Sequence, residues 1–520
     1  MTTTCTAQRR WRLGDVLSDT ETSVPGHAAL IIGSDRRRVG YDELSSAAGE
    51  LTAVLRRRGL RRGDVIGVQM TTSAHFVVAL LAAARLGIVV APLNPALPTS
   101  EQRSKVDALG ARVVLVDRDP DTAGACPEWQ VVPGHRGLPT QLEGATSPRV
   151  VAPLAGLTAD DALIMSTSGT SGDPKFVPWT HHNLAAAVTG IACAYGLSSA
   201  DATVAVMPLF HGHGLVAGLL ATLATGGTVL LPAAGRFSAH TFWDDVDAAG
   251  TTWFTAVPTI HRILLDRAAS GGPDEHRVIP PLRFIRSCSA PLSAETVTEL
   301  EATFRTTVVA AYGMTETTHQ ASTAVPSADS DTRLHTVGAP TGLTARILRA
   351  DGSVASVGEV GEICFRGPAV VRGYLPPRTD DVFDGEWLRT GDLGMLDDEQ
   401  HLAVTGRIKN LINRGGEKIS AEHVEEVLGA HPSIAQVAVV GLPDRVYGER
   451  VAAVIVRNTA LTAQEVTDYA RARLARYEVP DQFVFVDQLP LTAKGDVDRA
   501  VLRHQLEHGS ELMTPHLERC

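Results

Sequence analysis

A chain of 520 residues is too long to fold around one hydrophobic core, so two or more domains are expected. Hydrophobic residues make up 44% of the sequence and charged residues 20%, which excludes an intrinsically disordered protein. The net charge of −11 argues against a nucleic-acid-binding protein, which would carry a basic surface.

The cysteines and the apolar segments indicate the compartment. Six cysteines are scattered without a C-x-x-C pair or a short spacing to histidine, which predicts reduced thiols and neither a disulfide framework nor a zinc site. No apolar run follows the N-terminal arginines, and the apolar stretch at 76–93 is interrupted by Arg85, Gly87 and Pro92. We therefore expect a cytoplasmic protein without a signal peptide or a membrane span.

Strand and helix patterns alternate through the first 311 residues. A hairpin is expected at 28–41, a loop or linker at 118–160, and helices at 41–58, 73–86, from about 100, 183–195, 214–225, 241–249 and 259–269. Strands are expected at 64–70, 87–91, 111–116, 162–165, 202–207, 228–231, 252–256, 283–287 and 307–311. This alternation predicts an α/β fold with two doubly wound, mainly parallel sheets.

The pattern changes from about residue 336. Short β segments separated by glycine, at 345–348, 359–366 and 387–389, predict a small β-barrel or sheet. After the segment 406–418, a helix capped by Ser420, strands at 434–440 and 451–456 and a helix opened by Thr462 and Glu465 are expected. We predict a large N-terminal domain of residues 1–406 and a smaller, mobile α/β lid domain of residues 407–520.

Polar or glycine-rich loops follow three of the predicted strands. The first, STSGTSGDPK at 166–175, combines five hydroxyl side chains, two glycines and one lysine. These groups can bind a polyphosphate, although the spacing is not that of a Walker loop and an ordinary polar turn is the alternative. The other loops are Ser287 to Leu292 and Ala311 to Thr317. If their strands are neighbours, the three loops line one cleft.

In this order, over about residues 15–505, the motifs STSGTSGDPK, AYGMTET, TGD and GRIKNLINRGGEKIS resemble the acyl-adenylate-forming superfamily of acyl-CoA synthetases, luciferases and peptide-synthetase adenylation domains. The segments MPLFHGHGL, LPAAGRF, TAVPTIHRI and TETTH are most similar to its oxalate–CoA ligase branch. The resemblance implies that a carboxylate attacks the α-phosphorus of ATP, that pyrophosphate leaves, and that the lid rotates before a thiol, such as that of CoA, displaces AMP.

The resemblance also implies roles for individual residues. The implied ATP-binding residues are Thr167, Ser168, Gly169, Thr170, Ser171, Gly172 and Lys175 at the β- and γ-phosphates, Ser289, Ala290, Pro291, Ala311, Tyr312, Gly313, Met314 and Thr315 around adenine, Asp392 at the ribose and Arg407 at the ribose or phosphate. The remaining implied roles are Glu316 for Mg²⁺, Lys409 for the hinge, and Gly415, Gly416 and Lys418 for a loop that faces the acceptor.

The acid-binding residues implied by the branch are His211, Ser289 and His319. A small anion needs hydrogen-bond donors, and imidazole changes charge near neutral pH, so acid binding is expected to depend on pH. His211 is the strongest of the three because it follows an aromatic residue at a strand end, where the family has a gating histidine. For His213, a surface or satisfied core position is favoured.

The sequence departs from the family near its C-terminus. Asp496 stands where the family has a lysine that bridges the acid and the α-phosphate. A carboxylate there would repel both anions, and Lys494 could replace the lysine if the segment is extended, because residues two apart point to the same side. A second departure is Phe176, at a position where glycine is usual.

Three functions remain open. The favoured one is a CoA ligase for a small dicarboxylate such as oxalate, dependent on ATP and Mg²⁺. The second is an enzyme that uses ATP to activate nitrite for diazotisation or N-nitrosation of an amine, which suits both a site for a tiny anion and the altered lysine. The third is a nucleotide-binding homologue that has lost catalysis, for which Asp496 is the only support.

Overall fold

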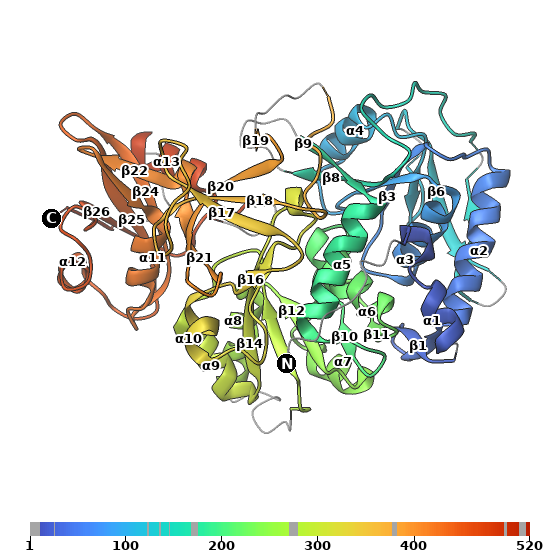
Figure 1. Cartoon of the computed structure of the whole chain (residues 1–520), viewed down its shortest axis with the longest axis horizontal. Helices are drawn as coiled ribbons and strands as arrows, with labels where there is room; N and C mark the ends of the chain where they lie inside the picture. Colours follow the sequence, from blue (N-terminus) through green and yellow to red (C-terminus); the bar gives the residue numbers. More distant parts are fainter. Residues whose placement is uncertain are drawn as a thin grey trace. The chain divides into compact units, whose positions relative to one another are not determined.

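The computed structural model describes residues 11–24, 26–121, 124–134, 137–144, 146–167, 175–269, 279–376, 382–492, 497–508 and 516–519. The chain divides into two compact units (Figure 1). Unit 1 consists of Met1–Ala345 and Phe365–Leu388, and unit 2 of Arg346–Cys364 and Arg389–Cys520. The predicted α/β class is confirmed, whereas a hinge after residue 406 stays a proposal.

Unit 1 contains a seven-stranded sheet in the order β7-β6-β5-β3-β4-β8-β9. Its strands are β3 (Val65–Gln69), β4 (Val89–Pro92), β5 (Val114–Val116), β6 (Glu128–Pro133), β7 (Pro139–Glu143), β8 (Asp161–Thr167) and β9 (Lys175–Thr180). Parallel pairing links β6, β5, β3, β4 and β8, and the edge strands β7 and β9 are antiparallel. The predicted loop at 118–160 is thus partly wrong: the alternating run around Trp129 forms a hairpin despite its Pro- and Gly-rich surroundings.

The second doubly wound layer consists of two adjacent sheets. The four-stranded sheet has the order β10-β11-β1-β2, with β10 (Ala202–Val204), β11 (Thr228–Leu230), β1 (Ala28–Ile32) and β2 (Arg37–Gly40). The five-stranded sheet has the order β12-β13-β14-β15-β16, with β12 (Trp253–Ala256), β13 (Phe284–Ser287), β14 (Thr307–Tyr312), β15 (Ser322–Thr323) and β16 (Ala339–Pro340). The Thr252 N–H donates to the Ala202 carbonyl at 2.9 Å, which joins β12 to β10.

Six predicted helices of unit 1 begin and end close to their predicted positions: α2 (Tyr41–Arg57), α3 (Ala74–Leu86), α4 (Thr99–Ala108), α5 (His181–Tyr195), α7 (Phe242–Ala249) and α8 (Pro258–Ala269). The sequence did not predict η1 (Leu13–Asp15), α1 (Ser18–Ser23), α9 (Ala294–Phe304), η3 (Thr315–Thr317) and α10 (Ser330–His335). The predicted helix at 214–225 ends in α6 (Ala221–Ala224). One predicted helix differs in kind, because residues His213–Leu220 (η2) form a π-helix ahead of α6. Such wide turns are rare and frequently lie at functional sites.

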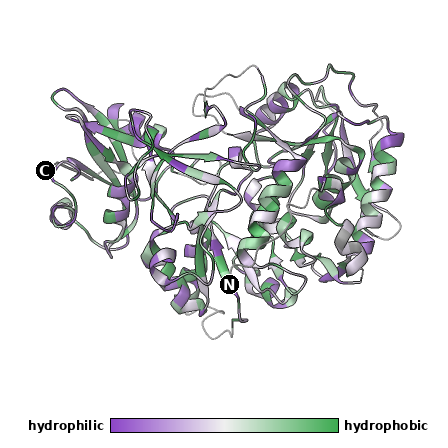
Figure 2. Ribbon diagram, viewed as in Figure 1, coloured by the Kyte–Doolittle hydropathy of each residue, from purple (hydrophilic) through white to green (hydrophobic). Residues whose placement is uncertain are grey.

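The main core lies in unit 1, where hydrophobic residues, green in Figure 2, follow the strands and the helices that pack on them. Helix α3 is buried along most of its length, because its side chains are almost all apolar. No helix in the described part of the chain has the length and hydropathy needed to span a membrane.

A small β sheet follows at 344–407. Its strands pair in the order β17-β18-β20-β19, with β21 on β20, and are β17 (Thr344–Leu348), β18 (Gly361–Arg366), β19 (Phe383–Asp384), β20 (Trp387–Leu396) and β21 (Leu402–Arg407). The sequence predicted either a small barrel or a sheet here. The pairings of the described strands form a sheet and do not close into a barrel.

Unit 2 ends in an α/β layer of six strands, three α-helices and one short 3-10 turn among the described residues. The strands are β22 (Leu411–Arg414), β23 (Glu417–Ser420), β24 (Ile434–Asp444), β25 (Gly448–Arg457), β26 (Gln482–Val486) and β27 (His516–Arg519). The helices are η4 (Ile408–Asn410), a single turn, and α11 (Ala421–Gly429), α12 (Ala463–Arg471) and α13 (Arg499–His508). The predicted smaller α/β C-terminal layer is present.

The cysteines differ from expectation at one position. Cys126, Cys288 and Cys364 are free and buried, as reduced thiols would be. Cys193 is disulfide-bonded, which corrects the prediction that every thiol is reduced. Sequence spacing could not identify this cysteine, because a disulfide depends on distance in the fold rather than along the chain.

Candidate active site

Two of the three predicted strand-end loops are neighbours. β13 and β14 pair in parallel, with Ser287 opposite Ala310, so the loops after them leave the same edge of the five-stranded sheet. β8 belongs to the other sheet, so the three strands are not all neighbours. Its hairpin partner β9 nevertheless contacts the loop after β14, because the Trp179 indole donates to the Thr315 carbonyl at 2.8 Å.

Lys175, Tyr374 and Glu316 form the first polar group of the site. The ammonium of Lys175 lies 4.7 Å from the centre of the Tyr374 ring. The Tyr374 hydroxyl donates to Glu316 Oε1 at 2.6 Å, and the Glu316 carbonyl accepts from the Val371 N–H at 2.9 Å. Tyr374 was not predicted from the sequence, because one tyrosine in a Pro- and Gly-rich segment carries no periodic signal.

This group suits Mg²⁺ and phosphate. Glu316 is buried and offers a hard oxygen ligand, and the tyrosine that donates to it also contacts the Lys175 ammonium. The described residues contain no cluster of three metal-ligating side chains. Mg²⁺ needs none, since it is usually held by one or two carboxylates together with waters and substrate phosphates. Thr167 and Lys175 are ladder partners at the ends of β8 and β9, and the predicted phosphate ligands Ser168, Gly169, Thr170, Ser171 and Gly172 lie outside the described residues.

A second polar group surrounds Arg286, on β13. His213 Nδ1 lies 3.1 Å from Ser289 Oγ and His213 Nε2 lies 2.6 Å from Thr255 Oγ1. The His213 and His319 rings stack with their centres 5.0 Å apart. Arg286 contacts both rings, at 3.3 Å and 3.5 Å from their Nε2 atoms. Sequence reasoning missed Arg286, although an arginine within the apolar run Phe284–Ser287 was an available signal.

The backbone around this group is unusual. Ser289, Thr318 and His319 have φ values of 77°, 51° and 74°, in the left-handed region that side chains other than glycine rarely adopt. A Cβ atom on Gly313 would lie 1.8 Å from the His319 carbonyl oxygen, so only glycine fits there. Strained backbone of this kind is concentrated at functional sites.

The two stacked imidazoles are neutral. Burial holds the pKa of His213 well below its ordinary value, and the neighbouring His319 and Arg286 lower it further. Burial and Arg286 likewise hold the pKa of His319 well below its ordinary value. Any titration of these two rings is thereby moved well below neutral pH, away from the range expected for ordinary imidazoles.

His211 lies near enough to this group for its charge to lower the pKa of His213. Its ring packs against Phe210, with 4.5 Å between the ring centres, and its carbonyl accepts from the Leu215 N–H at 2.9 Å. The structure brings His213 into contact with Ser289 and His319. Both ring nitrogens of His213 have partners, as the favoured interpretation of a satisfied core residue requires, but one partner is the strand-end Ser289.

The residues implied for adenine follow the two strand ends. Ala311 is buried in β14, and Tyr312 is half-buried with its ring 6.0 Å from that of Phe365. Gly313, Met314 and Thr315 are half-buried, and Ser289, Ala290 and Pro291 are exposed. Exposed loop atoms beside a half-buried aromatic ring are compatible with a stacked base.

Unit 2 carries the remaining predicted residues. Asp392 lies within β20 opposite Arg407 on β21, and the two side chains form an ion pair at 2.9 Å. Burial and the Arg407 charge lower the pKa of Lys409, in the single turn η4. Gly415 and Gly416 form the turn between β22 and β23, with φ values of 62° and 99°, and Lys418 follows in β23. Lys494 and Asp496 lie outside the described residues.

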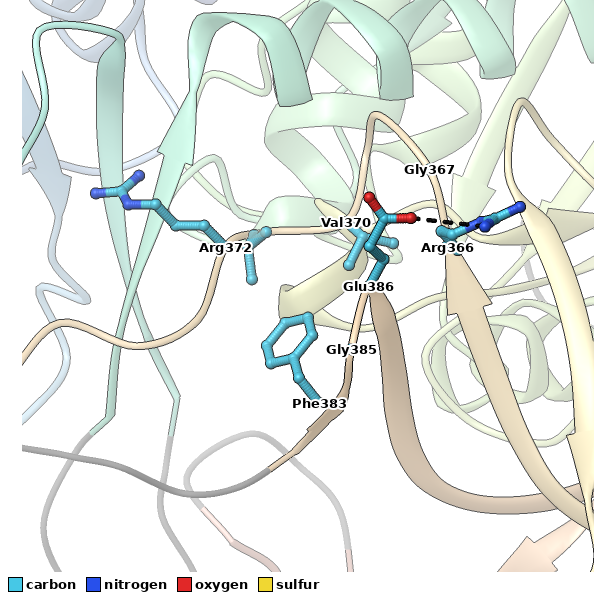
Figure 3. A pocket seen from close by; sticks show the side chains of 8 residues that line it. Arg366, Gly367, Val370, Arg372, Phe383, Gly385 and Glu386 are labelled. Atoms are coloured by element: carbon cyan, nitrogen blue, oxygen red, sulfur yellow. Dashed lines mark ion pairs between the residues drawn. The ribbon is translucent and has the colours of Figure 1, made fainter. Parts of the chain in front are cut away.

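A pocket of about 470 Å³ lies elsewhere in unit 1, between the end of β18 and β19 (Figure 3). Two arginines line it, but Arg366 is paired with Glu386 at 3.6 Å. Arg372 extends away from Phe383 in Figure 3 and forms a two-pronged ion pair with Asp161. Since a carboxylate already accompanies each cation, this pocket is a poorer anion site than the strand-end loops.

Comparison with known proteins adds an independent observation. The AMP-binding enzyme family matches residues 18–375, and the AMP-binding enzyme C-terminal domain matches residues 423–496. An oxalate–CoA ligase from Arabidopsis thaliana is 39% identical over 482 residues, covering 90% of this chain and 93% of that protein. A sulfoacetate–CoA ligase from Cupriavidus necator is 35% identical over 495 residues, covering 92% and 94%. ATP-bound MatB from Rhodopseudomonas palustris has a TM-score of 0.82 at 28% identity, covering 96% of this chain and 100% of that one.

Proposed function

Because the chain belongs to the AMP-binding enzyme family, as an ATP-dependent adenylate-forming ligase, we propose that it activates a small, doubly charged acid such as oxalate and transfers it to CoA. The observation that carries this proposal is the polar group at the ends of β13 and β14, where Ser289, His213 and His319 surround a buried arginine. A long acyl chain would need an apolar lining instead.

The relatives support this substrate class. By their names, one relative acts on oxalate and another on sulfoacetate. Each of these acids carries two anionic groups on a two-carbon skeleton. A compact dianion is best recognised by several hydrogen-bond donors and a nearby positive charge. Both are present in the group formed by Ser289, His319 and Arg286.

The side chains divide the chemistry between them. Ser289 and the two imidazoles orient the acid so that one carboxylate oxygen attacks the α-phosphorus of ATP as the bond to pyrophosphate breaks. Lys175 offsets charge on the phosphate oxygens, and Glu316, held by Tyr374, provides a carboxylate for Mg²⁺. Mg²⁺ supplies charge neutralisation at the phosphates when bound. In the second half-reaction the CoA sulfur attacks the acyl carbon, and AMP leaves with the electrons of the broken C–O bond.

Nitrite activation is the second candidate, favoured by one residue. Asp496 replaces the lysine that would bridge a carboxylate to the α-phosphate. An enzyme that joins nitrite to AMP and passes the nitrosyl group to an amine would need a different arrangement of charge at this position. The same strand-end donors fit nitrite, so only the products separate the two candidates.

The test offers ATP and Mg²⁺ with oxalate, malonate, sulfoacetate, acetate or nitrite, each with and without CoA or an aromatic amine. We expect AMP, pyrophosphate and a thioester with a short dianionic acid plus CoA. AMP release only with nitrite plus amine would move the assignment to the second candidate. Absence of turnover with all five acids would indicate a nucleotide-binding homologue that has lost catalysis. The Lys175→Ala variant is the control for contaminating ligases.

A further inference from the structure

The guanidinium of Arg286 is fully buried and has only neutral acceptors among the described residues. It donates to the Tyr195 hydroxyl at 3.1 Å through Nε, to Thr255 Oγ1 at 3.0 Å through Nη1, and to Gln320 Oε1 at 2.8 Å through Nη2. The free thiol of Cys288 lies beside it. No ion pair joins Arg286 to a carboxylate within the described ranges, although buried charges are ordinarily paired.

The hydrogen bonds of Arg286 fix the protons on its two histidine neighbours. A guanidinium group can only donate, so Nε2 of His213 and Nε2 of His319 must both accept. The single proton of each neutral ring then lies on Nδ1. Thr255 agrees with this assignment, because its hydroxyl accepts from Arg286 and can donate onward to His213 Nε2 at 2.6 Å.

The fixed proton of His213 points to the exposed strand end. Nδ1–H of His213 donates to Ser289 Oγ at 3.1 Å, which leaves the Ser289 hydroxyl proton for an outside acceptor. The Nδ1 proton of His319 has no acceptor within the described part of the chain and is likewise available. A positive charge at the inner end of a hydrogen-bond chain polarises each donor along it toward an anion.

We propose that Arg286 is the positioning residue of the acid site, which holds His213 and His319 as Nδ1–H tautomers and selects acids that carry a second anionic group. This inference rests on the proposed function for its substrate class, but not for the tautomers. Arg286 acts from behind the site, through the two rings and Ser289, and does not itself touch the acid. Its charge favours a dianion over a monoanion because the extra negative charge remains near the strand ends.

The first test needs no turnover and leaves Arg286 unchanged. The protein is labelled with ¹⁵N at histidine, and the ring nitrogens of His213 and His319 are assigned by comparison with His213→Gln and His319→Gln. We expect both rings to carry a proton on Nδ1 and none on Nε2 at about pH 7. A proton on Nε2 of either ring would overturn the inference even if the protein proved to be an oxalate–CoA ligase.

The second test measures selectivity. Arg286→Met removes the charge at similar size, and Arg286→Lys keeps it. The matched control is Arg85→Met, because Arg85 also donates to neutral acceptors, the Gly14 carbonyl and Ser45, at the far end of α3. We expect Arg286→Met to lower kcat/KM for oxalate at least about tenfold more than for acetate, and Arg286→Lys to recover part of this selectivity.

The outcomes distinguish the proposed role of Arg286 from the proposed function of the protein. Equal losses for oxalate and acetate in Arg286→Met, with thermal unfolding like that of Arg85→Met, would overturn the inference and leave the proposed function standing. Absence of thioester with any acid in the wild-type protein would overturn the proposed function, whereas the tautomer measurement would still decide the role of Arg286. If Arg286→Met does not fold, the proposal is tested with Arg286→Lys and with the ¹⁵N histidine spectra of the wild-type protein.

Discussion

Tyr374→Phe removes the hydroxyl that donates to Glu316 at 2.6 Å and leaves the ring beside Lys175 in place. A hydrogen bond to a charged group contributes about 1.5–3 kcal/mol, and Tyr374 is only half-buried, so we take about 2 kcal/mol. That energy corresponds to a factor of about 30 in kcat/KM if the Glu316 carboxylate must be held during adenylyl transfer.

The ring has its own, smaller effect. Tyr374→Leu also removes the aromatic face that lies 4.7 Å from the Lys175 ammonium. A partly exposed contact of this kind contributes about 0.5–1 kcal/mol, so a further two- to fivefold loss is expected, roughly, relative to Tyr374→Phe. Comparison of the two variants therefore separates the hydroxyl from the ring.

The assay is pyrophosphate release at increasing Mg²⁺ concentration with saturating acid. We expect Tyr374→Phe to need more Mg²⁺ for half-maximal rate, because Glu316 loses the group that orients its carboxylate. Tyr469→Phe is the matched control, since Tyr469 is also half-buried with a cation, Arg473, 3.8 Å from its ring centre, but lies on α12. A kcat/KM for Tyr374→Phe within about twofold of wild type would refute the reasoning.

Three further predictions concern charge and protonation. Lys175→Ala should lower the adenylation rate about 100-fold, measured by ATP–pyrophosphate exchange; an unchanged rate would remove the loop lysine from the mechanism. Asp496→Lys should raise the adenylation rate with oxalate about tenfold by replacing repulsion with attraction, and a neutral or harmful effect would favour nitrite chemistry. Burial lowers the pKa of His181 to about 4, and the Leu13 N–H donates to its Nδ1 at 3.0 Å. Because the unfolded chain binds the proton more readily, the His181 imidazole lowers the stability of the fold as pH falls from about 6.5 toward about 4. The His181→Asn variant should therefore lose less thermal stability than wild type between about pH 7 and pH 5. Equal losses in the two proteins would contradict a lowered pKa for His181.

The sequence predicted where strands end better than which side chains meet there. The strands at 283–287 and 307–311 were located to within a residue, because short apolar runs between turn residues mark buried strands. Arg286 lies inside such a run, and its burial depends on Tyr195, Thr255 and Gln320, which lie on other elements. Such long-range contacts leave no periodic signal in the chain. The hairpin at β6 and β7 was missed for a related reason: its Pro- and Gly-rich surroundings outweighed a six-residue alternating strand.

The contacts of His213 show how local backbone geometry positions a side chain at these strand ends. His211 lies two positions earlier, and sequence favoured His211 because an aromatic residue precedes it. The π-helix begins at His213, and a Cβ atom on Gly212 would lie 2.7 Å from the Trp179 ring and 3.2 Å from His319 Cβ. Gly212 therefore permits the close approach at which His213 stacks on His319. Gly212→Ala should disturb this stacking without changing any polar side chain, and an unchanged oxalate KM in that variant would show that the stacking is not needed for acid binding.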